Sequence, residues 1–419
     1  MDKQKGATFE NHFFYILKYD YAHLCVTEKS EQVLSMAKQI IMAVTNDLLT
    51  DQRVDRTCTT LQEAGYAVTL VGRHLPESPR MELRPYRCVR MRLLFRRSAL
   101  FYAEYNVRLL LKLLATPADL FYSNDTDTLI ACCWAARLRK KPLVFDAHEL
   151  FPEVPELVDK PFVRRVWRGV ERRCLPHVSL AFTVSRPVAD EYNRRYGIKM
   201  KVLRNVPQCA TFEPLVKQVG KQTTLLYQGA VNVGRGVREL VDVMELLPDC
   251  RLVVAGDGDL LETLQSYAAT KPWVGRIEFL GRVTPQRLHL LTQQADLGLC
   301  LLEELGLSYR YALPNRIGDY ARAGVPVLAT GFEAIKEVVG HYGIGTLTEA
   351  CPHKKEGEEY EAYLGRLAAA VRGTLDYWQA LPQEEKSRRF AQAQKELCWD
   401  SEKKILLQGI DTIIEKKLR

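Results

Sequence analysis

The sequence has eleven cysteines but none of the spacings that mark a metal site or a disulfide framework. No two of them form a C-x-x-C pair, and several lie within apolar runs that are typical of strands or helices. A scatter of this kind is typical of buried free thiols in a reducing compartment. The sequence therefore favours unpaired structural cysteines over disulfides or a zinc site.

Long hydrophobic runs are missing as well. A membrane-spanning helix needs about eighteen to twenty apolar residues, and the apolar stretch Leu109–Ala115 is already interrupted by Lys112. The first residues, MDKQKGATFENHF, contain no continuous apolar segment of the kind that a secretory signal has. The composition, 47% hydrophobic and 26% charged with no low-complexity tract, is that of a globular protein. We therefore expect a cytoplasmic protein, peripheral to the inner face of a membrane if it meets one.

The charge is distributed unevenly along the chain. Residues 1–205 hold 33 of the 59 Lys and Arg but only 23 of the 51 Asp and Glu, so the remaining residues are close to neutral. This asymmetry predicts that the first half faces an anionic partner. Nucleic acid, phospholipid and a phosphate-bearing acceptor all qualify on charge alone.

Strand and helix patterns alternate through the first half. A length of 419 residues predicts two domains. Buried strands are expected at Ile40–Val44 and Ala67–Gly72, with a helical pattern between them. Strand, helix and strand at this spacing form a βαβ unit, which predicts a parallel sheet. Further strands are expected at 120–123, 142–148, 180–185 and 201–207, and helices at 54–65, 129–139 and 188–196.

A second series of the same kind follows a break in the pattern. Residues 208–222 have little periodicity and are interpreted as a linker. The predicted division is an N-terminal extension of unknown role at 1–35 (or a start of translation at Met36), domains at 36–207 and 223–395, and a C-terminal helix at 396–419 that packs back on the first domain. The second series has expected strands at 224–229, 251–256, 277–281, 296–302 and 326–331, and helices at 236–247, 260–269, 285–293 and 315–323.

Three motifs follow strands of the second series, where a doubly wound sheet binds its ligand. The first is Gly229-Ala-Val-Asn-Val-Gly-Arg-Gly236, in which glycines allow backbone N–H groups to approach a phosphate and Arg235 can hold two of its oxygens. The second is Ala255-Gly-Asp-Gly-Asp259. The third, residues 313–327, starts a helix near Asn315 and places Asp319 one turn later. The first motif alone is equally well explained as a tight turn, and the second alone as a turn with an N-cap aspartate. No motif is specific by itself.

Taken in this order, the motifs resemble the retaining glycosyltransferases of family 4 (glycosyl transferases group 1), which have the GT-B fold. The residues that carry the resemblance are YQGAVNVGRG, VVAGDG, FLGRV and LPNRIGDYARAGVPVLA, together with VFDAHELFPEV, TVSRPVADEYNRRYG and VLRNVP in the first half. The resemblance covers residues 38 to 345 and implies an α/β protein with two Rossmann-like domains of doubly wound parallel sheet that face a cleft. It also suggests polysaccharide or lipid-linked glycan assembly in a bacterium.

The resemblance implies roles for individual residues. Arg235 would bind the pyrophosphate of a nucleotide-sugar donor, with Asn315 and Arg316 near the phosphates. Asp319 would hold the ribose, and Arg282 lies in the loop expected near the base. His148, at the end of the FDAHE strand, would face the sugar. Close backbone approach would be allowed by Gly229, Gly234, Gly236 and Gly258.

The sequence also departs from the family pattern. Ala230 stands where the family has an arginine, and Tyr311 stands in place of the first acid of its Glu-x₇-Glu pair. The glycine pair expected after the first strand is missing, and Arg53 is a candidate to replace part of the lost positive charge. These departures bear on the identity of the donor and on catalytic geometry.

A D-x-D triplet, Asp125-Thr-Asp127, invites comparison with metal-binding carboxylates. It precedes a helical pattern in the first domain, away from the expected phosphates, so N-capping of that helix is the better interpretation. We expect no metal and no cofactor. Arg235, Arg316 and the helix N-termini would do the work of a cation.

Arginines among apolar residues form two basic segments in the first half. One interpretation of Met81–Lys112 is a solvated helical face; the other is an amphipathic segment that lies on anionic lipid. Nucleic acid is disfavoured because no recognition module is present. The arginines are Arg84, Arg87, Arg90, Arg92, Arg96, Arg97 and Arg108, and a second cluster at Arg164, Arg165, Arg168, Arg172 and Arg173 extends the same character.

The function predicted from the sequence is a metal-independent glycosyltransferase that moves a sugar, with retention of configuration, to a glycan or lipid-linked acceptor. Two alternatives stay open. One is a nucleotide-sugar epimerase of the same fold. The other is a non-catalytic nucleotide-binding partner of a glycan-assembly complex, which Ala230 and Tyr311 keep in view.

Overall fold

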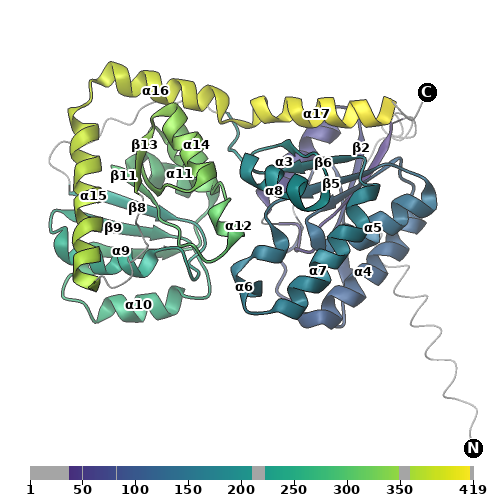
Figure 1. The fold of residues 1–419 in the computed structure, drawn as a ribbon, viewed down its shortest axis with the longest axis horizontal. Coiled ribbons are helices and arrows are strands. Elements are labelled where there is room, and N and C mark those ends of the chain that lie inside the picture. The colour runs from purple at the N-terminus through teal and green to yellow at the C-terminus, as the bar shows by residue number, and fades with distance from the viewer. Residues whose placement is uncertain (1–36, 50, 82, 210–221, 349–358, 416–419) are drawn as a thin grey trace, which may run out of the picture. The chain divides into compact units, whose positions relative to one another are not determined.

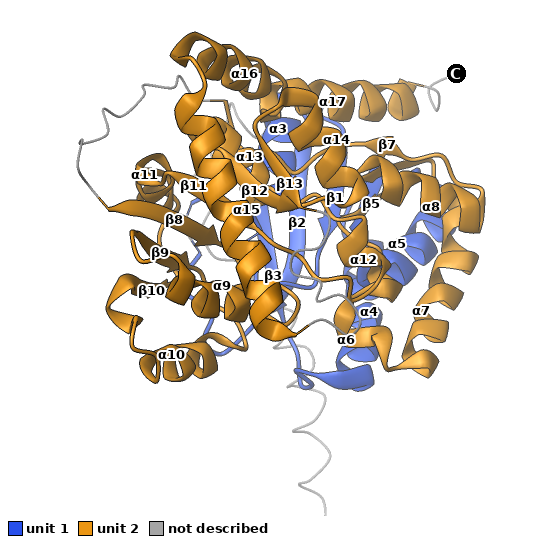
Figure 2. Cartoon of the chain, turned by 60° about the vertical axis from the view of Figure 1, so that its left-hand side comes forward, with its two compact units in different colours: residues 1–144 blue, residues 145–419 orange. Residues whose placement is uncertain are grey.

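The computed structural model describes residues 37–49, 51–81, 83–209, 222–348 and 359–415. The chain divides into two compact units, residues 1–144 and residues 145–419, which are coloured separately in Figure 2. The expectations for residues 1–35, and for most of the linker at 208–222, lie outside the described residues.

Seven strands form the first sheet, in the order β3-β2-β1-β4-β5-β6-β7. β4 and β5 are buried at every position, as strands covered on both faces are. The strands are β1 Gln39–Ala43, β2 Ala67–His74, β3 Arg87–Arg92, β4 Leu120–Asn124, β5 Leu143–Ala147, β6 Leu180–Thr183 and β7 Lys201–Val202. The helices of this part of the chain are α3 Gln52–Glu63, α4 Ser98–Ala115, α5 Thr126–Arg139, α6 Pro155–Val158, α7 Pro161–Cys174 and α8 Arg186–Tyr196, with 3₁₀ turns at Phe151–Glu153 and Leu175–His177.

The basic stretch Met81–Lys112 is not one amphipathic segment. It contains the edge strand β3 and then, from Ser98, the helix α4. In β3 the buried Val89 and Met91 alternate with arginines, and an edge strand tolerates such charges because one side of it has no neighbour. The prediction of a single segment was therefore wrong, and a strand that sequence reasoning missed stands in its place.

The loop after β1 is built without the glycine pair of the family pattern. Leu48 adopts a left-handed conformation (φ 74°) and packs on β2, where a Cβ added to Gly72 would lie 2.4 Å from the Leu48 Cδ2 atom. The carbonyl of Asn46 accepts a hydrogen bond from the Arg73 amide at 2.9 Å. Asp51 caps α3 by accepting from the Val54 amide at 3.1 Å. Backbone and side-chain hydrogen bonds together hold this loop in place of glycine turns.

Six strands form the second sheet, in the order β10-β9-β8-β11-β12-β13, and all neighbouring pairs are parallel. This is the doubly wound arrangement that the repeated strand–helix pattern predicted. The strands are β8 Thr223–Gln228, β9 Cys250–Ala255, β10 Ile277–Gly281, β11 Leu297–Cys300, β12 Val327–Thr330 and β13 Gly345–Thr348. They lie within a few residues of the predicted ones, and β13 was not predicted.

Helices cover both faces of the second sheet (Figure 1). Because successive strand residues point to opposite faces, Leu225 and Tyr227 join a core with α9 and α15, whereas Leu226 joins a core with α13, α14 and α16. The helices are α9 Val237–Val243, α10 Leu261–Ala269, α11 Pro285–Gln294, α12 Leu307–Arg310, α13 Asn315–Ala323, α14 Glu333–Tyr342, α15 Tyr360–Ala380, α16 Gln383–Glu396 and α17 Trp399–Glu415, with 3₁₀ turns at Met244–Leu246 and Val274–Arg276.

The C-terminal helix α17 packs on a strand of the first sheet. Gly409 faces β6, where an added Cβ would lie 3.0 Å from side-chain carbons of Leu180 and Phe182. Near the start of the helix, Glu402 accepts hydrogen bonds from the backbone and side chain of Arg204, at 2.8 and 2.6 Å. These contacts lie within the second compact unit.

A disulfide joins Cys209 to Cys398, across 189 residues of sequence. The prediction that the cysteines are unpaired is therefore wrong for these two, although the seven other described cysteines are free thiols. The pairing was invisible in the sequence because no local spacing encodes it. It depends on the chain after β7 meeting the start of α17, where the Trp399 amide donates to the Pro207 carbonyl at 2.9 Å.

The second basic cluster, on α7, is partly neutralised. Arg164 and Arg168 both bond to the carboxylate of Glu153, and Arg195 of α8 joins them at 2.6 Å. Arg165, Arg172 and Arg173 remain exposed. Among the described helices, none is both long enough and apolar enough to cross a membrane.

Candidate functional site

The loop after β8 contains three glycines with positive φ. Gly229, Gly234 and Gly236 have φ of 121°, 78° and 67°, which side-chain-bearing residues rarely adopt. A Cβ at Gly234 would lie 2.4 Å from a carbon of Leu305, and one at Gly236 would lie 2.9 Å from the Cβ of Leu301. The glycines therefore serve both the turn and its close packing on the segment that follows β11.

Arg235 is held between two of these glycines by an aromatic ring. Its guanidinium carbon lies 4.4 Å from the centre of the Tyr309 ring, in α12. Its Nε atom is buried and has no hydrogen-bond partner among the described residues. Burial raises the pKa of the Tyr309 hydroxyl, and the neighbouring Arg235 works in the opposite direction. The ring thus orients a guanidinium that keeps hydrogen-bonding capacity for a ligand.

Arg316, in the first turn of α13, is held in the same way. Its guanidinium carbon lies 4.4 Å from the centre of the Tyr227 ring in β8, and its side chain is buried. Burial alone would lower the pKa of Arg316, but Tyr227 and its neighbours raise it, so the group stays charged. The Arg316 Nη1 atom has no hydrogen-bond partner within the described chain. A Cβ at Gly229 would lie 3.1 Å from Nη2, so this glycine admits the guanidinium to the turn.

Asp319, one turn further along α13, is oriented by the end of β8. Gln228 donates from Nε2 to the Asp319 Oδ2 atom at 2.9 Å. The other end of the same amide accepts from the Thr292 hydroxyl at 2.8 Å. A relay of side chains from α11 through β8 therefore fixes the direction of the carboxylate predicted to hold a ribose.

The remaining predicted donor residues follow β9 and β10 or begin α13. Gly258 packs beneath the first loop, because an added Cβ would lie 2.3 Å from the Asn232 Oδ1 atom. Its lack of a side chain thus serves loop packing. Arg282 follows β10 and is exposed, with Nη2 at 3.9 Å from the Asp257 carboxylate. Asn315 is exposed at the start of α13.

His148 follows β5, as predicted. Its Nε2 atom lies 3.7 Å from a carboxylate oxygen of the fully buried Asp146. The next residue, Glu149, accepts a hydrogen bond from the Ser308 hydroxyl at 3.5 Å. Partial desolvation of its carboxylate raises the pKa of Glu149, although the residue as a whole is exposed, and Arg235 lies close enough to lower that pKa in part. The loop that carries His148 is therefore electrostatically linked to the loop that carries Arg235.

Two candidates of the first unit are placed differently from the others. Arg53, within α3, is only 2% exposed. Its proposed contribution to the donor site stays a prediction. Asp125 stands at the N-cap of α5, as predicted, but its side chain makes no capping hydrogen bond. Asp127 instead accepts from the Thr45 hydroxyl at 2.5 Å.

Two of the departures from the family pattern, Ala230 and Tyr311, are held by hydrogen bonds to their backbone carbonyls. The carbonyl of Ala230 accepts from the Tyr227 hydroxyl at 2.5 Å. The carbonyl of Tyr311 accepts from the Ser185 hydroxyl at 2.8 Å. In the described part of the chain, no group of three or more His, Cys, Asp or Glu is arranged to hold a metal ion.

Sequence reasoning missed the residues that position the predicted ones. Tyr227, Tyr309 and Gln228 contact Arg316, Arg235 and Asp319 across long stretches of chain. The only signal in the sequence is that Tyr227 and Gln228 end the strand before the glycine turn. No signal in the sequence indicated Tyr309, because its helix, α12, is too short to show a periodic pattern.

Comparison with family models gives two matches. Residues 51–207 match the model of Glycosyltransferase Family 4, and residues 222–357 match the model of Glycosyl transferases group 1. The two matches lie on either side of the predicted linker. A sequence comparison with curated proteins gives no match.

Solved structures of similar fold cover nearly the whole chain. Sucrose-phosphate synthase from Thermosynechococcus elongatus is 16% identical, with a TM-score of 0.69 over 90% of this chain and 100% of that one. The lipopolysaccharide outer core galactosyltransferase WaaB is 13% identical, with a TM-score of 0.61 over 90% and 99%. HepE from Anabaena, solved with UDP-glucose, is 15% identical, with a TM-score of 0.62 over 89% and 99%. At these identities the likeness shows the fold.

Proposed function

This chain belongs to the glycosyltransferases described by the two family models that it matches, Glycosyltransferase Family 4 and Glycosyl transferases group 1. From that membership we propose that it transfers a sugar from a nucleotide-sugar donor to a glycan or lipid-linked acceptor with retention of configuration. In the proposed reaction, the bond between the sugar C1 and the donor phosphate breaks and a bond from C1 to an acceptor oxygen forms on the same face. The leaving phosphate takes the acceptor proton, so the protein supplies no nucleophile.

The observation that carries this proposal is the pair of arginines around the turn after β8. Arg235 and Arg316 are each stacked on a tyrosine, and each has a buried N–H group without a partner among the described residues. No carboxylate of the described chain forms an ion pair with either. An unneutralised buried cation is costly unless an anion completes the site, and a diphosphate is an anion of suitable charge and geometry for two guanidinium groups.

These arginines also suit catalysis without a metal. As C1 separates from the diphosphate, negative charge grows on the leaving group, and fixed cations stabilise that charge more than they stabilise the ground state. Their tyrosine rings keep them in position before the reaction starts. We propose that Asp319 binds the ribose, that Arg282 and Asn315 lie beside the nucleotide, and that His148 faces the sugar.

The first experiment measures thermal unfolding against UDP-, GDP-, ADP- and CMP-sugars without divalent metal. A ligand at about a hundred times its dissociation constant adds about 2.7 kcal/mol to the unfolding free energy, so one nucleotide should shift the transition clearly. The shift should vanish in Arg235→Ala. The matched control is Arg238→Ala, which removes another arginine stacked on a tyrosine, with 4.6 Å from its guanidinium carbon to the Tyr267 ring centre.

A control that loses the shift as fully as Arg235→Ala would show that the site is elsewhere. No shift with any nucleotide sugar would overturn the donor site. Hydrolysis of the bound donor without acceptor separates an enzyme of this class from a protein that only binds the nucleotide.

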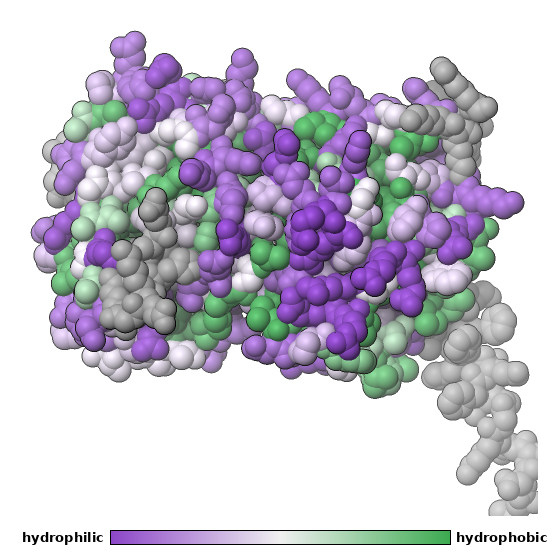
Figure 3. All heavy atoms as spheres, in the orientation of Figure 1, coloured by the Kyte–Doolittle hydropathy of each residue, from purple (hydrophilic) through white to green (hydrophobic). Residues whose placement is uncertain are grey.

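We propose that the acceptor is reached at an anionic membrane surface on the cytoplasmic side. Support comes from α7, where Phe162 and Val166 are 72% and 49% exposed beside the exposed Arg165. Hydrophilic residues gather over this part of the molecule in Figure 3. A mixed apolar and basic helix face is typical of contact with anionic lipid. Sedimentation with anionic vesicles tests the proposal; equal binding to neutral vesicles, or none at all, would remove it.

A further inference from the structure

A pocket of about 260 Å³ opens in the first unit, where β2 and β3 end. The two strands are parallel neighbours, and His74 pairs in register with Arg92. Their carboxyl ends are the edge at which doubly wound sheets bind ligands. The walls include Arg73, Arg96 and Phe95 as well as these two residues.

The charge of this pocket is all of one sign. Three arginines and a histidine line it, and no Asp or Glu does. Among the described residues, none of the three arginines forms an ion pair with a carboxylate, and the Nε atom of Arg73 is buried without a hydrogen-bond partner. The contrast with nearby arginines is clear, because Arg84 pairs with Asp55 and Arg108 pairs with Glu104.

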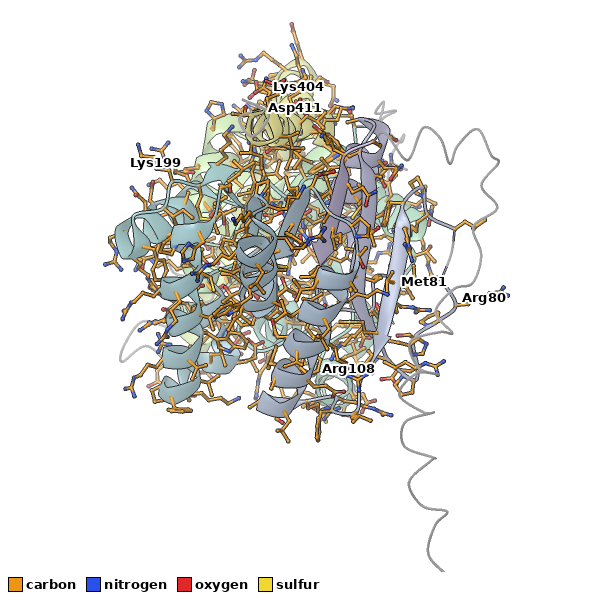
Figure 4. The ribbon with its side chains drawn as sticks, turned by 90° about the vertical axis from the view of Figure 1, so that its right-hand side faces the viewer. Arg80, Met81, Arg108, Lys199, Lys404 and Asp411 are labelled. Atoms are coloured by element: carbon orange, nitrogen blue, oxygen red, sulfur yellow. A yellow bond between two sulfur atoms is a disulfide. The ribbon has the colours of Figure 1, made fainter. Side chains whose placement is uncertain are left out.

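The walls of the pocket are held by specific bonds. Glu104 of α4 accepts hydrogen bonds from the amides of Leu94 and Phe95, at 2.9 and 2.8 Å, and so fixes the loop between β3 and α4. The guanidinium of Arg73 stacks on the Phe101 ring, with its carbon 4.7 Å from the ring centre. In Figure 4, Arg108 lies on α4 and the Arg80 side chain projects away from the chain around it.

We propose that this pocket binds a phosphate group of the acceptor. The inference rests on the proposed glycosyltransferase function and names the chemical class of its acceptor. Guanidinium groups at the carboxyl ends of strands match a phosphate dianion in charge and in hydrogen-bond geometry, and the absence of lining carboxylates leaves the positive charge uncancelled. The phosphate belongs either to a lipid-linked acceptor or to a soluble sugar phosphate.

The test compares direct binding by the full chain and by two variants. The first variant, Arg92→Gln with Arg96→Gln, removes two exposed lining charges. The second, Arg80→Gln with Arg87→Gln, removes the same number of exposed charges from the same unit outside the pocket. Calorimetry with inorganic phosphate, a hexose 6-phosphate and a polyprenyl monophosphate in neutral detergent gives the affinities. The donor-induced thermal shift is measured in parallel for all three proteins.

The pocket variant should bind at least one phosphate probe about tenfold or more weakly, with an unchanged donor shift, and the control variant should bind as the original does. Preference for the polyprenyl phosphate identifies a lipid acceptor, and preference for the hexose phosphate identifies a soluble one. Equal affinities in all three proteins, or no binding of any probe, would overturn the proposal. Arginine-dependent phosphate binding without any donor shift would leave the pocket standing and refute the donor site instead.

Discussion

Arginine has opposite surroundings in two regions of the second unit. Around Glu153, the side chains of Arg164, Arg168 and Arg195 converge on one carboxylate that is 5% exposed. At the donor turn, Arg235 of the loop after β8 and Arg316 of α13 lie over tyrosine rings and pair with no carboxylate of the described chain. One region satisfies its charges internally, and the other presents them to something outside the chain.

The difference shows what separates a structural arginine from a functional one here. A carboxylate fixes a guanidinium but also cancels its charge, whereas an aromatic face fixes it and leaves the charge and the N–H groups available. Count and clustering of arginines in the sequence do not reveal this, since the α7 cluster is denser than the pair at the donor turn. Whether an arginine is structural or functional depends on whether a carboxylate pairs with it, and that carboxylate comes from elsewhere in the chain.

The strongest test of this contrast is Arg235→Ala. We expect turnover to fall about 10²- to 10³-fold, because a fixed cation at the leaving group is lost. Stability without ligand should hardly change, since Arg235 makes no ion pair within the described chain. Steady-state kinetics and chemical denaturation of the same variant measure both effects. Near-normal turnover would remove Arg235 from the reaction.

Removing the carboxylate of Glu153 should lower the stability of the protein, in contrast to Arg235→Ala, which should lower turnover. Glu153→Gln removes the carboxylate shared by Arg164, Arg168 and Arg195, of which, among the described residues, only Arg195 keeps another carboxylate partner, Glu191. We expect the free energy of unfolding to fall by about 2 kcal/mol. The arginines are themselves partly exposed, which keeps the loss below that of a fully buried pair. Denaturant titration measures it. Arg165→Gln, at an exposed position of α7, is the control and should change stability by less than about 0.5 kcal/mol.

Removing the Tyr309 ring beneath Arg235 should lower donor affinity or turnover less than removing the Arg235 charge does. In Tyr309→Leu the guanidinium loses its ring, and we expect donor affinity or turnover to fall about fivefold, the equivalent of about 1 kcal/mol. Tyr309→Phe keeps the ring and should stay close to the original enzyme. If both variants lose activity equally, the hydroxyl and not the aromatic face positions Arg235.

The smallest expected effect is the pH dependence of the stability that the Glu153 carboxylate contributes. Burial alone would raise the pKa of Glu153, but hydrogen bonds from Arg168 and Arg195 outweigh it and lower the pKa. A carboxylate with a lowered folded pKa adds stability that is complete above its unfolded pKa of about 4.3 and is lost as the pH falls through the folded value. The stability difference between the original protein and Glu153→Gln should therefore shrink only below about pH 4. A difference that already disappears near neutral pH would contradict this assignment.

The sequence was most informative where structure is local. Apolar runs bounded by turns predicted the strands from β8 to β12 within a few residues, and the glycines at 229, 234 and 236 predicted the turn after β8. Both depend on neighbours in the chain. The family matches confirm the glycosyltransferase family that these motifs suggested.

The sequence was least informative where contacts are distant. Tyr309 and Tyr227 reach their arginines only in the folded chain, and no spacing links them. β3 was missed because alternating arginines read as a basic segment, although the long aliphatic stems of arginine suit an exposed sheet edge. Cys209 and Cys398 likewise carry no local signature of their pairing.

The 189-residue separation of Cys209 and Cys398 has a consequence for biosynthesis. At about 5 to 20 residues per second, a ribosome needs roughly ten to forty seconds to make the chain between them. During that interval Cys209 has been made and its partner has not, while all the strands of the second sheet are produced. The bond can therefore form only after all the strands of the second sheet have been synthesised.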